Sequence, residues 1–301
     1  MNLDTLLEKI QQQREQQTIA IAHATDPSVF KSAEKALQQN LASFIFIGPE
    51  AAMIEAKQKA SFSFDLDNRV DWFYTLNEVD SARLAVKLVK DGKAEVLMKG
   101  MIETSSLLKA VLNKEYGLRT GNILSHLAGF SFPGRSSLLF VTDAAMNISP
   151  ELKEKVQIIE NAAKAVQKMG ITLPKVAVLA AVETVNPAMQ ATLDAAVLTQ
   201  MNRRNQLSHC EVDGPLGFDN AISIEAADQK GIKSNVAGHA DILMVPAIET
   251  GNVLYKSLTY FGQATVGGMI VGAKAPIVLT SRSDSVESKL FSMAMALSST
   301  K

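Results

Sequence analysis

The chain has 301 residues, of which 47% are hydrophobic and 20% are charged, as in an ordinary globular protein. Its 30 Lys and Arg against 31 Asp and Glu give a formal net charge of −1, which argues against nucleic acid or a membrane surface as a partner, because both attract basic proteins. One cysteine, Cys210, excludes an internal disulfide and fits a reducing compartment. The first 17 residues include three acidic side chains, and the longest uncharged run, 257–273, contains four glycines. We therefore expect a soluble cytoplasmic protein without a signal peptide or membrane span.

Short apolar runs alternate with amphipathic stretches through the first hundred residues. The apolar runs predict strands at 18–24, 43–48, 70–74 and 95–100. The spacing of apolar residues, with Asp26-Pro27, Pro49 and Asp91-Gly92 as end signals, predicts helices over 3–10, 26–40, after Pro49 and over 78–91.

The same alternation continues in the rest of the chain. It predicts strands at 137–143, 175–182, 240–246 and 276–280. It predicts helices from Ser149-Pro150 to Gly170, from Asn186-Pro187, over 218–231, near 252–261 and over 286–297. Strands that are apolar on both faces and separated by helices are typical of parallel βαβ units, so we predict an α/β fold based on parallel sheets.

A chain of this length is near the limit of a single core, so two domains are expected. The turn-forming segment 132–135, Phe-Pro-Gly-Arg, lies between two strand-like runs and is the predicted point of division.

Several kinds of site are excluded by their missing motifs. The sequence has no P-loop, and the glycines of 267–272 do not have the spacing of a dinucleotide-binding loop. The four histidines are scattered and no CxxC occurs, so a metal site built from His and Cys is not expected. Ser208-His209-Cys210 is interpreted as the start of a strand with a buried thiol, because adjacent side chains cannot form a triad.

The most informative segment runs from the strand at 276–280 through Ser281, Arg282, Ser283 and Asp284 into the last helix. Backbone N–H groups, hydroxyls and a guanidinium then meet at a helix N-terminus, which is an arrangement that binds phosphate-type anions. Ordinary N-capping by Ser and Asp explains the same residues equally well.

Polar side chains at three other places are candidate site residues. Asp143 and Asn147 follow the strand at 137–143, where they can point into a cleft or cap the turn. Asp213 and Asp219 flank a predicted Gly-Pro turn, and Lys99 ends the strand at 95–100. Each has a structural alternative: a turn residue for the carboxylates and a solvated side chain for the lysine.

Taken together, six strings resemble the phosphate acetyltransferase/phosphate butyryltransferase family. They occur in family order, at 98–100, 124–126, 142–150, 212–223, 240–256 and 272–285. The Leu-Ser-His at 124–126 and the Thr-Asp-Ala-Ala-Met-Asn at 142–147 are more like the butyryl branch.

The resemblance implies a two-domain α/β fold of the isocitrate/isopropylmalate dehydrogenase type with an active cleft between the domains. Because the C-terminal segment of such folds returns to the first domain, we assign residues 1–133 and 278–301 to one domain and 134–277 to the other. The implied reaction is acyl-CoA + phosphate ⇌ acyl phosphate + CoA, most like the butyryl enzyme, with CoA as a substrate and no cofactor or metal. We expect a homo-oligomer that is metabolically coupled to an acyl kinase.

The resemblance also implies roles for individual residues. Ser281, Glu287 and Asp284 are expected to be catalytic: Ser281 as a hydrogen-bond donor to the developing oxyanion, Glu287 as base and Asp284 as the residue that orients Arg282. The expected substrate-binding residues are Arg282, Ser283, Lys99, Ser125, His126, Asp143, Asn147, Asp213 and Asn252.

This chain departs from the family pattern at two positions. Ala247 replaces an acidic residue of many members, and Ser288 stands where the acetyl enzymes have the aspartate proposed as base for the CoA thiol. The alternatives are therefore a phosphate acetyltransferase and a non-catalytic acyl-CoA-binding member of the family. An oxidative decarboxylase on a similar fold would need metal-binding aspartates and a nucleotide loop, which the sequence lacks.

Overall fold

The computed structural model describes residues 1–12, 15–280 and 284–300. Contacts between residues divide the chain into two compact units. Unit 1 consists of Met1–Asn2 and Ile123–Ala264, and unit 2 consists of Leu3–Asn122 and Thr265–Lys301. The boundaries between the two units therefore lie after Asn122 and Ala264. The domain boundaries predicted from the sequence lie after residues 133 and 277.

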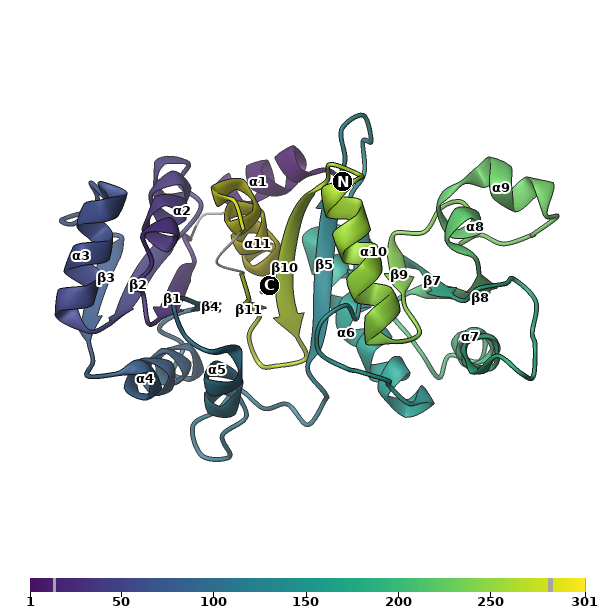
Figure 1. The fold of residues 1–301 in the computed structure, drawn as a ribbon, viewed down its shortest axis with the longest axis horizontal. Helices are drawn as coiled ribbons and strands as arrows, with labels where there is room; N and C mark the ends of the chain where they lie inside the picture. Colours follow the sequence, from purple (N-terminus) through teal and green to yellow (C-terminus); the bar gives the residue numbers. More distant parts are fainter. Residues whose placement is uncertain (13–14, 281–283, 301) are drawn as a thin grey trace. The chain divides into compact units, whose positions relative to one another are not determined.

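Unit 2 contains a sheet in the order β3-β2-β1-β4-β11-β10, with helices on both faces (Figure 1). Its strands are β1 (Thr18–Ala22), β2 (Ser43–Gly48), β3 (Val70–Tyr74), β4 (Val96–Lys99), β10 (Thr265–Val271) and β11 (Ile277–Val278). Its helices are α1 (Leu3–Gln11), α2 (Pro27–Gln38), α3 (Glu50–Ala60), α4 (Glu78–Lys90), α5 (Thr104–Val111) and α11 (Val286–Ser298).

Helix α4 packs against β1, β2 and β4, while α11 packs against β10 and contacts α1 and α2. Asp26 caps α2 as predicted, since its side chain accepts a hydrogen bond from the backbone N–H of Ser28. The sheet and α2 bury a cluster of aromatic rings, in which Phe46 stacks on Phe30 and Trp72 with centroids 4.7 and 4.9 Å apart. These contacts join α2, β2 and β3 in one apolar core, on which α11 packs through α2.

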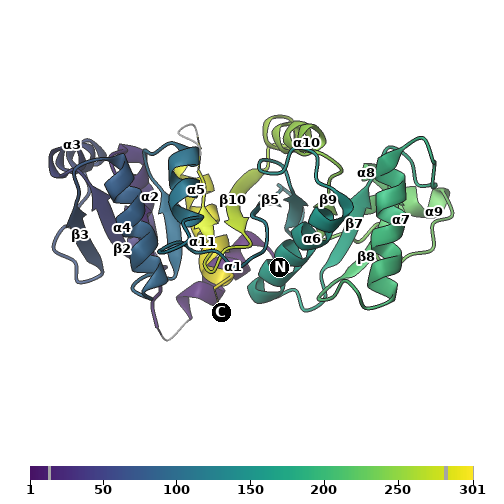
Figure 2. The same ribbon diagram turned by 90° about the horizontal axis from the view of Figure 1, so that it is seen from below.

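Unit 1 contains strands in the order β5-β6-β9-β7-β8, of which Figure 2 labels β5, β9, β7 and β8. Its strands are β5 (Ser125–Ser131), β6 (Leu139–Thr142), β7 (Lys175–Leu179), β8 (Glu211–Leu216) and β9 (Ile242–Met244). Its helices are α6 (Leu152–Met169), α7 (Gln190–Arg203), α8 (Phe218–Ile222), α9 (Ile224–Gln229) and α10 (Ile248–Tyr260). Helices α6 and α7 contact each other and pack on the sheet, and α8 and α10 also contact its strands.

The predicted α/β class is confirmed, but the sheets are not wholly parallel. Strands β5 and β6 pair antiparallel, and so do β10 and β11. The segment 132–138 is too short for a crossover between parallel strands, which needs a dozen or more residues, so the Pro-Gly turn joins two strands of one sheet.

Several predicted helices begin or divide at other residues. Helix α6 starts at Leu152, because Glu151 and Glu154 form a reciprocal capping box beyond Ser149-Pro150. Helix α7 starts at Gln190, and α10 starts at Ile248, one turn before the predicted residue. Ser223 caps α9 and divides the predicted helix over 218–231 into two. Within the described residues, none of the helices is long and apolar enough to cross a bilayer.

Candidate active site

Three of the predicted site residues, Ser281, Arg282 and Ser283, lie outside the residues that the structure describes. The helix that follows them is described from its cap onward. The Ser285 side chain accepts a hydrogen bond from the Ser288 backbone N–H at 3.1 Å. This contact fixes the first turn of α11 immediately beyond the predicted anion-binding segment 281–283, which we call the anion loop.

Glu287, the predicted base, lies in the first turn of α11. Its carboxylate is exposed and pairs with Lys35 of α2 at 3.0 Å. A hydrogen bond from its own backbone N–H, together with Lys35, lowers the pKa of Glu287. A lower pKa favours a stable carboxylate and makes Glu287 a weaker proton acceptor.

Lys289 is a residue that the sequence analysis did not select. Its side chain is 1% exposed, and its ammonium donates a hydrogen bond to the Asp284 carbonyl at 2.7 Å. Burial lowers the pKa of Lys289, and the charges of Asp284 and Asp26 act in the opposite direction. The signal that could have found it is a lysine on the apolar face of a helix. Asp284 therefore lies between the predicted anion loop and a buried cation.

Lys99 ends β4, as predicted, but it is not a freely solvated lysine. Its ammonium donates to the backbone carbonyls of Ile102, at 2.9 Å, and Gly100, at 3.3 Å. A Cβ on Gly100 would lie 2.4 Å from the carbonyl oxygen of His23. Glycine is thus required for the close approach of the chain ends that follow β4 and β1.

In unit 1, Asp143 and Asn147 form a connected turn after β6. Asp143 is 2% exposed, and one of its carboxylate oxygens accepts hydrogen bonds from the backbone N–H groups of Ala145 and Met146, both at 2.9 Å. Its other oxygen accepts a 2.6 Å bond from the Asn147 amide, which also donates to the Leu124 carbonyl. Asp143 therefore holds the turn together and orients Asn147.

Ser125 and His126 lie on β5 and are both buried. The Ser125 hydroxyl lies 3.2 Å from the amide of Asn161, a residue that the sequence analysis missed. Burial lowers the pKa of His126, and the charge of Asp143 acts in the opposite direction. The Nδ1 atom of His126 has no hydrogen-bond partner among the described residues, and its ring centroid is 6.2 Å from that of Tyr255. The structure thus brings His126, Asp143 and Asn147 into one polar group, whereas the side chain of Ser125, the strand neighbour of His126, lies on the other face of β5 with Asn161.

Helix α10 lies against this group. A Cβ on Gly251 would come within 2.7 Å of the Asp143 carbonyl oxygen, so the helix and the turn pack backbone to backbone. Asn252, the next residue, is exposed on α10. Because α10 begins four residues before it, Asn252 lies in the second turn and not at the start of the helix.

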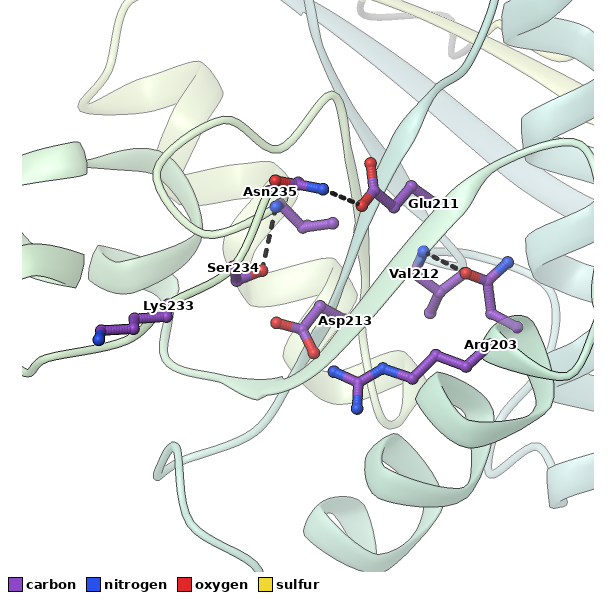
Figure 3. A pocket seen from close by; sticks show the side chains of 9 residues that line it. Arg203, Glu211, Val212, Asp213, Lys233, Ser234 and Asn235 are labelled. Atoms are coloured by element: carbon purple, nitrogen blue, oxygen red, sulfur yellow. Dashed lines mark hydrogen bonds between the residues drawn. The ribbon is translucent and has the colours of Figure 1, made fainter.

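Asp213 lies apart from these residues. The predicted Gly-Pro turn is wrong, because Gly214 and Pro215 lie within β8, where the pairing with β7 shifts register. Proline is tolerated there since β8 is an edge strand of unit 1 and the register shift removes the need for its missing N–H. Asp213 lines a cavity of about 490 Å³ with Arg203 and Lys233 (Figure 3). Of the other predicted site residues that the structure describes, none lines this cavity.

The residues that the structure describes include no group of three or more His, Cys, Asp or Glu side chains placed to hold a metal ion. The cysteine is buried, as predicted, and burial raises the pKa of its thiol to about 12. Cys210 thus has no reactive thiolate near neutral pH.

The chain is similar to several known proteins. The family model described as Phosphate acetyl/butaryl transferase matches residues 70–297. A probable phosphate butyryltransferase of Bacillus subtilis is 50% identical over 280 residues, which cover 93% of this chain and 92% of the relative. A phosphate butyryltransferase of Clostridium beijerinckii is 44% identical over 296 residues, covering 98% and 96%.

Solved structures agree with these matches. The crystal structure of a branched-chain phosphotransacylase from Enterococcus faecalis is 39% identical, with a TM-score of 0.82 over 94% of this chain and 98% of that one. A 4-hydroxythreonine-4-phosphate dehydrogenase from Klebsiella pneumoniae, 14% identical with a TM-score of 0.57 over 95% and 100% of the two chains, shares the fold alone. This likeness confirms the predicted dehydrogenase-type fold. The motifs, the family match and these identities together show that the chain belongs to the phosphate acetyl/butyryl transferase family.

Proposed function

We propose that the protein transfers a short-chain acyl group, butyryl best, reversibly between CoA and inorganic phosphate. The observation that carries this proposal is the 44–50% identity, over almost the whole chain, to relatives named phosphate butyryltransferase. The branched-chain phosphotransacylase at 39% identity also supports an acyl group larger than acetyl.

The proposed reaction uses the anion loop for phosphate. Arg282 binds the phosphate in bidentate fashion, with Ser283 beside it, because a planar guanidinium matches two oxygens of a tetrahedral anion. Ser281 donates a hydrogen bond to the thioester oxygen as it becomes an oxyanion, a contribution of about 10²–10³ in kcat at comparable sites. The further proposed substrate-binding residues are Lys99, Ser125, the polar group of His126, Asp143 and Asn147, and the side chains of Asn252 and Asp213. The proposed reaction needs no cofactor or metal.

The test is a thiol-release assay. Butyryl-CoA and phosphate are mixed with the protein, and free CoA is measured with a thiol reagent. Phosphate-dependent release of CoA supports the proposal. Release that does not require phosphate indicates a thioesterase, and no release with any acyl-CoA, despite measurable binding, indicates the non-catalytic alternative.

A second copy of the chain is proposed as the partner of α10. Of the 13 residues of this helix, all of them described, Gly251 alone is buried, and Val253 and Tyr260 are 65% and 75% exposed. An apolar groove of about 510 Å³ lies beside the helix, lined by Leu179, Ala180, Phe218, Pro246, Glu249, Thr250, Val253, Leu254 and Ser257. An exposed surface of this kind is typical of an interface. Light scattering after size exclusion should show a dimer or larger assembly that Val253→Asp dissociates; a monomeric wild-type protein would refute the assignment.

The proposed product also suggests a place in metabolism. An acyl phosphate is a mixed anhydride that can phosphorylate a nucleoside diphosphate, so an acyl kinase is the proposed consumer. We propose the cytoplasm as the location, because the proposed reaction uses CoA and because the single cysteine excludes an internal disulfide.

A further inference from the structure

The proposed reaction needs a base that removes the proton of the CoA thiol. The residues near the anion loop that the family pattern suggests are poor candidates for this base. Glu287 pairs with Lys35, which together with its backbone hydrogen bond lowers its pKa. Ser288, at the position of the family's aspartate, has no basic side chain. Its backbone N–H is bound by the cap of α11. Neither residue is therefore a good base, and Asp284 is already assigned to orienting Arg282, which leaves the other described residues of unit 2 as candidates.

His23 lies at a favourable point of the unit 2 sheet. It directly follows β1, whose neighbours are β2 on one side and β4 on the other. The chain leaves β1 toward β2 through α2, whereas β4 is reached from β3 through α4, so the order of strands reverses at β1. Ligands of open parallel sheets bind beyond the carboxyl ends of the strands at such a reversal.

The same part of unit 2 contains the start of α11. Three residues after His23, Asp26 caps α2, and its charge acts on Lys289 together with that of Asp284. The Lys35–Glu287 pair joins the same two helices. His23 is thus on a segment that leads into the cap of α2, the helix that pairs with the first turn of α11.

The hydrogen bonds of Ser81 determine which nitrogen of His23 carries the proton. The Ser81 hydroxyl donates its single hydrogen to the Asn77 carbonyl at 2.8 Å. It can then only accept from the Thr75 hydroxyl, 2.7 Å away, and from Nδ1 of His23, 3.1 Å away. Nδ1 therefore carries the hydrogen, and Nε2 has a free lone pair, with no hydrogen-bond partner among the described residues.

The surroundings favour the neutral ring. Burial lowers the pKa of His23 below its ordinary 6.5, and the charge of Glu78 on α4 acts in the opposite direction. The other charged groups nearby are Lys99 at the end of β4 and Asp26 at the start of α2. The backbone of His23 has a φ of +61°, so the residue is held in the left-handed region, which histidine and asparagine tolerate better than most residues.

We propose that Nε2 of His23 is the base that accepts the CoA thiol proton, an assignment that rests on the proposed function. The proton passes from sulfur to Nε2, and the thiolate forms a bond to the carbonyl carbon of the acyl phosphate. The bond from that carbon to the phosphate oxygen breaks, and inorganic phosphate leaves with its electron pair. In the reverse direction, the protonated ring returns the proton to the departing thiolate.

The test is the pH dependence of a His23→Asn variant, because asparagine tolerates the backbone but has no basic nitrogen. With an ordinary thiol pKa near 8.5, about 3% of free CoA is thiolate at pH 7, so loss of the base costs at most about 30-fold in kcat/KM for CoA. The same calculation gives about 4-fold at pH 8 and less than 2-fold at pH 9. Because burial lowers the pKa of His23, wild-type activity should persist at pH 6.5 and fall only at lower pH, where the ring becomes protonated.

Two further variants make the outcome clear. His239→Asn changes an exposed histidine of unit 1 and should match wild type at every pH. Ser81→Ala removes the acceptor that holds Nδ1 and should give a smaller deficit with the same dependence on pH. A His23→Asn deficit that is equal at pH 7 and pH 9, or absent at both, overturns the assignment while leaving the proposed function intact. A wild-type protein without phosphate-dependent acyl transfer refutes the proposed function itself.

Discussion

The Lys155–Asp194 ion pair allows a stability prediction to be worked out from the structure. Lys155 of α6 and Asp194 of α7 are 6% and 7% exposed, and the ammonium lies 2.5 Å from a carboxylate oxygen. The amide of Gln190 donates to the second oxygen at 2.8 Å. Lys155→Met keeps the volume and removes the charge, so Asp194 is left buried with one neutral hydrogen-bond donor.

Removing one partner of a buried ion pair costs about 3–5 kcal/mol, because the remaining charge is not compensated. For a unit of this size, 1 kcal/mol corresponds to roughly 2–4 °C, so Lys155→Met should lower the melting temperature of unit 1 by about 6–20 °C. Differential scanning calorimetry measures this shift. Lys164→Met, at an exposed pair with Glu160 on the same helix, is the matched control and should cost less than about 1 kcal/mol.

The double variant Lys155→Met/Asp194→Leu separates charge from packing. Apolar residues of similar volume replace a buried ion pair at little cost, or with a gain of about 1–4 kcal/mol, so the double variant should recover the stability lost in Lys155→Met. A loss below about 1 kcal/mol in Lys155→Met, or a double variant less stable than the single one, would refute this reasoning.

Three further outcomes are expected. Arg282→Ala should lower kcat/KM for phosphate about 30-fold or more, since a charge-assisted contact contributes about 2 kcal/mol, and Arg282→Lys should raise the phosphate KM. Kinetics of Arg282→Ala within twofold of wild type would contradict the proposal that Arg282 binds phosphate. Butyryl-CoA should be used better than acetyl-CoA by about 15-fold in kcat/KM, from two methylenes at ~0.8 kcal/mol each, and a clear preference for acetyl-CoA would favour the acetyltransferase alternative. Because burial raises the pKa of the Cys210 thiol to about 12, the native protein should not react with a thiol reagent at pH 8, whereas the unfolded protein should react at this one cysteine. Rapid labelling of the native protein would contradict the buried position of Cys210.

Local signals predicted most of the secondary structure. Strands such as β2 are continuous apolar runs, and caps such as Asp26 mark helix ends. Strands β5 and β10 were missed because glycines and polar residues interrupt their apolar pattern. The antiparallel pairs were also missed, since side-chain alternation does not encode the direction of the neighbouring strand.

The site could be predicted only as residue types at strand ends. The sequence indicates Asp143 and Asn147 as polar residues after β6, but not that their side chains bind each other. His23 was passed over because its tautomer depends on Ser81, 58 residues away in sequence. The sequence analysis did not select Lys289, because its hydrogen bond to the Asp284 carbonyl depends on how the start of α11 folds. Such relations exist only in the folded chain.

The division of the chain has a consequence for the order of events during translation. Helix α11 completes the core of unit 2 by packing on β10, α2 and α1, yet it is synthesised after the whole of Ile123–Ala264. At ~5–20 residues per second, the ribosome needs roughly ten to forty seconds to deliver this helix after residue 122 has emerged. During that interval, the part of α2 that packs against α11 has no partner helix, although Phe30 of α2 can already pack on Phe46 of β2. Unit 2, which contains α1 and β1, is therefore the last to be completed, although most of its residues are synthesised before those of unit 1.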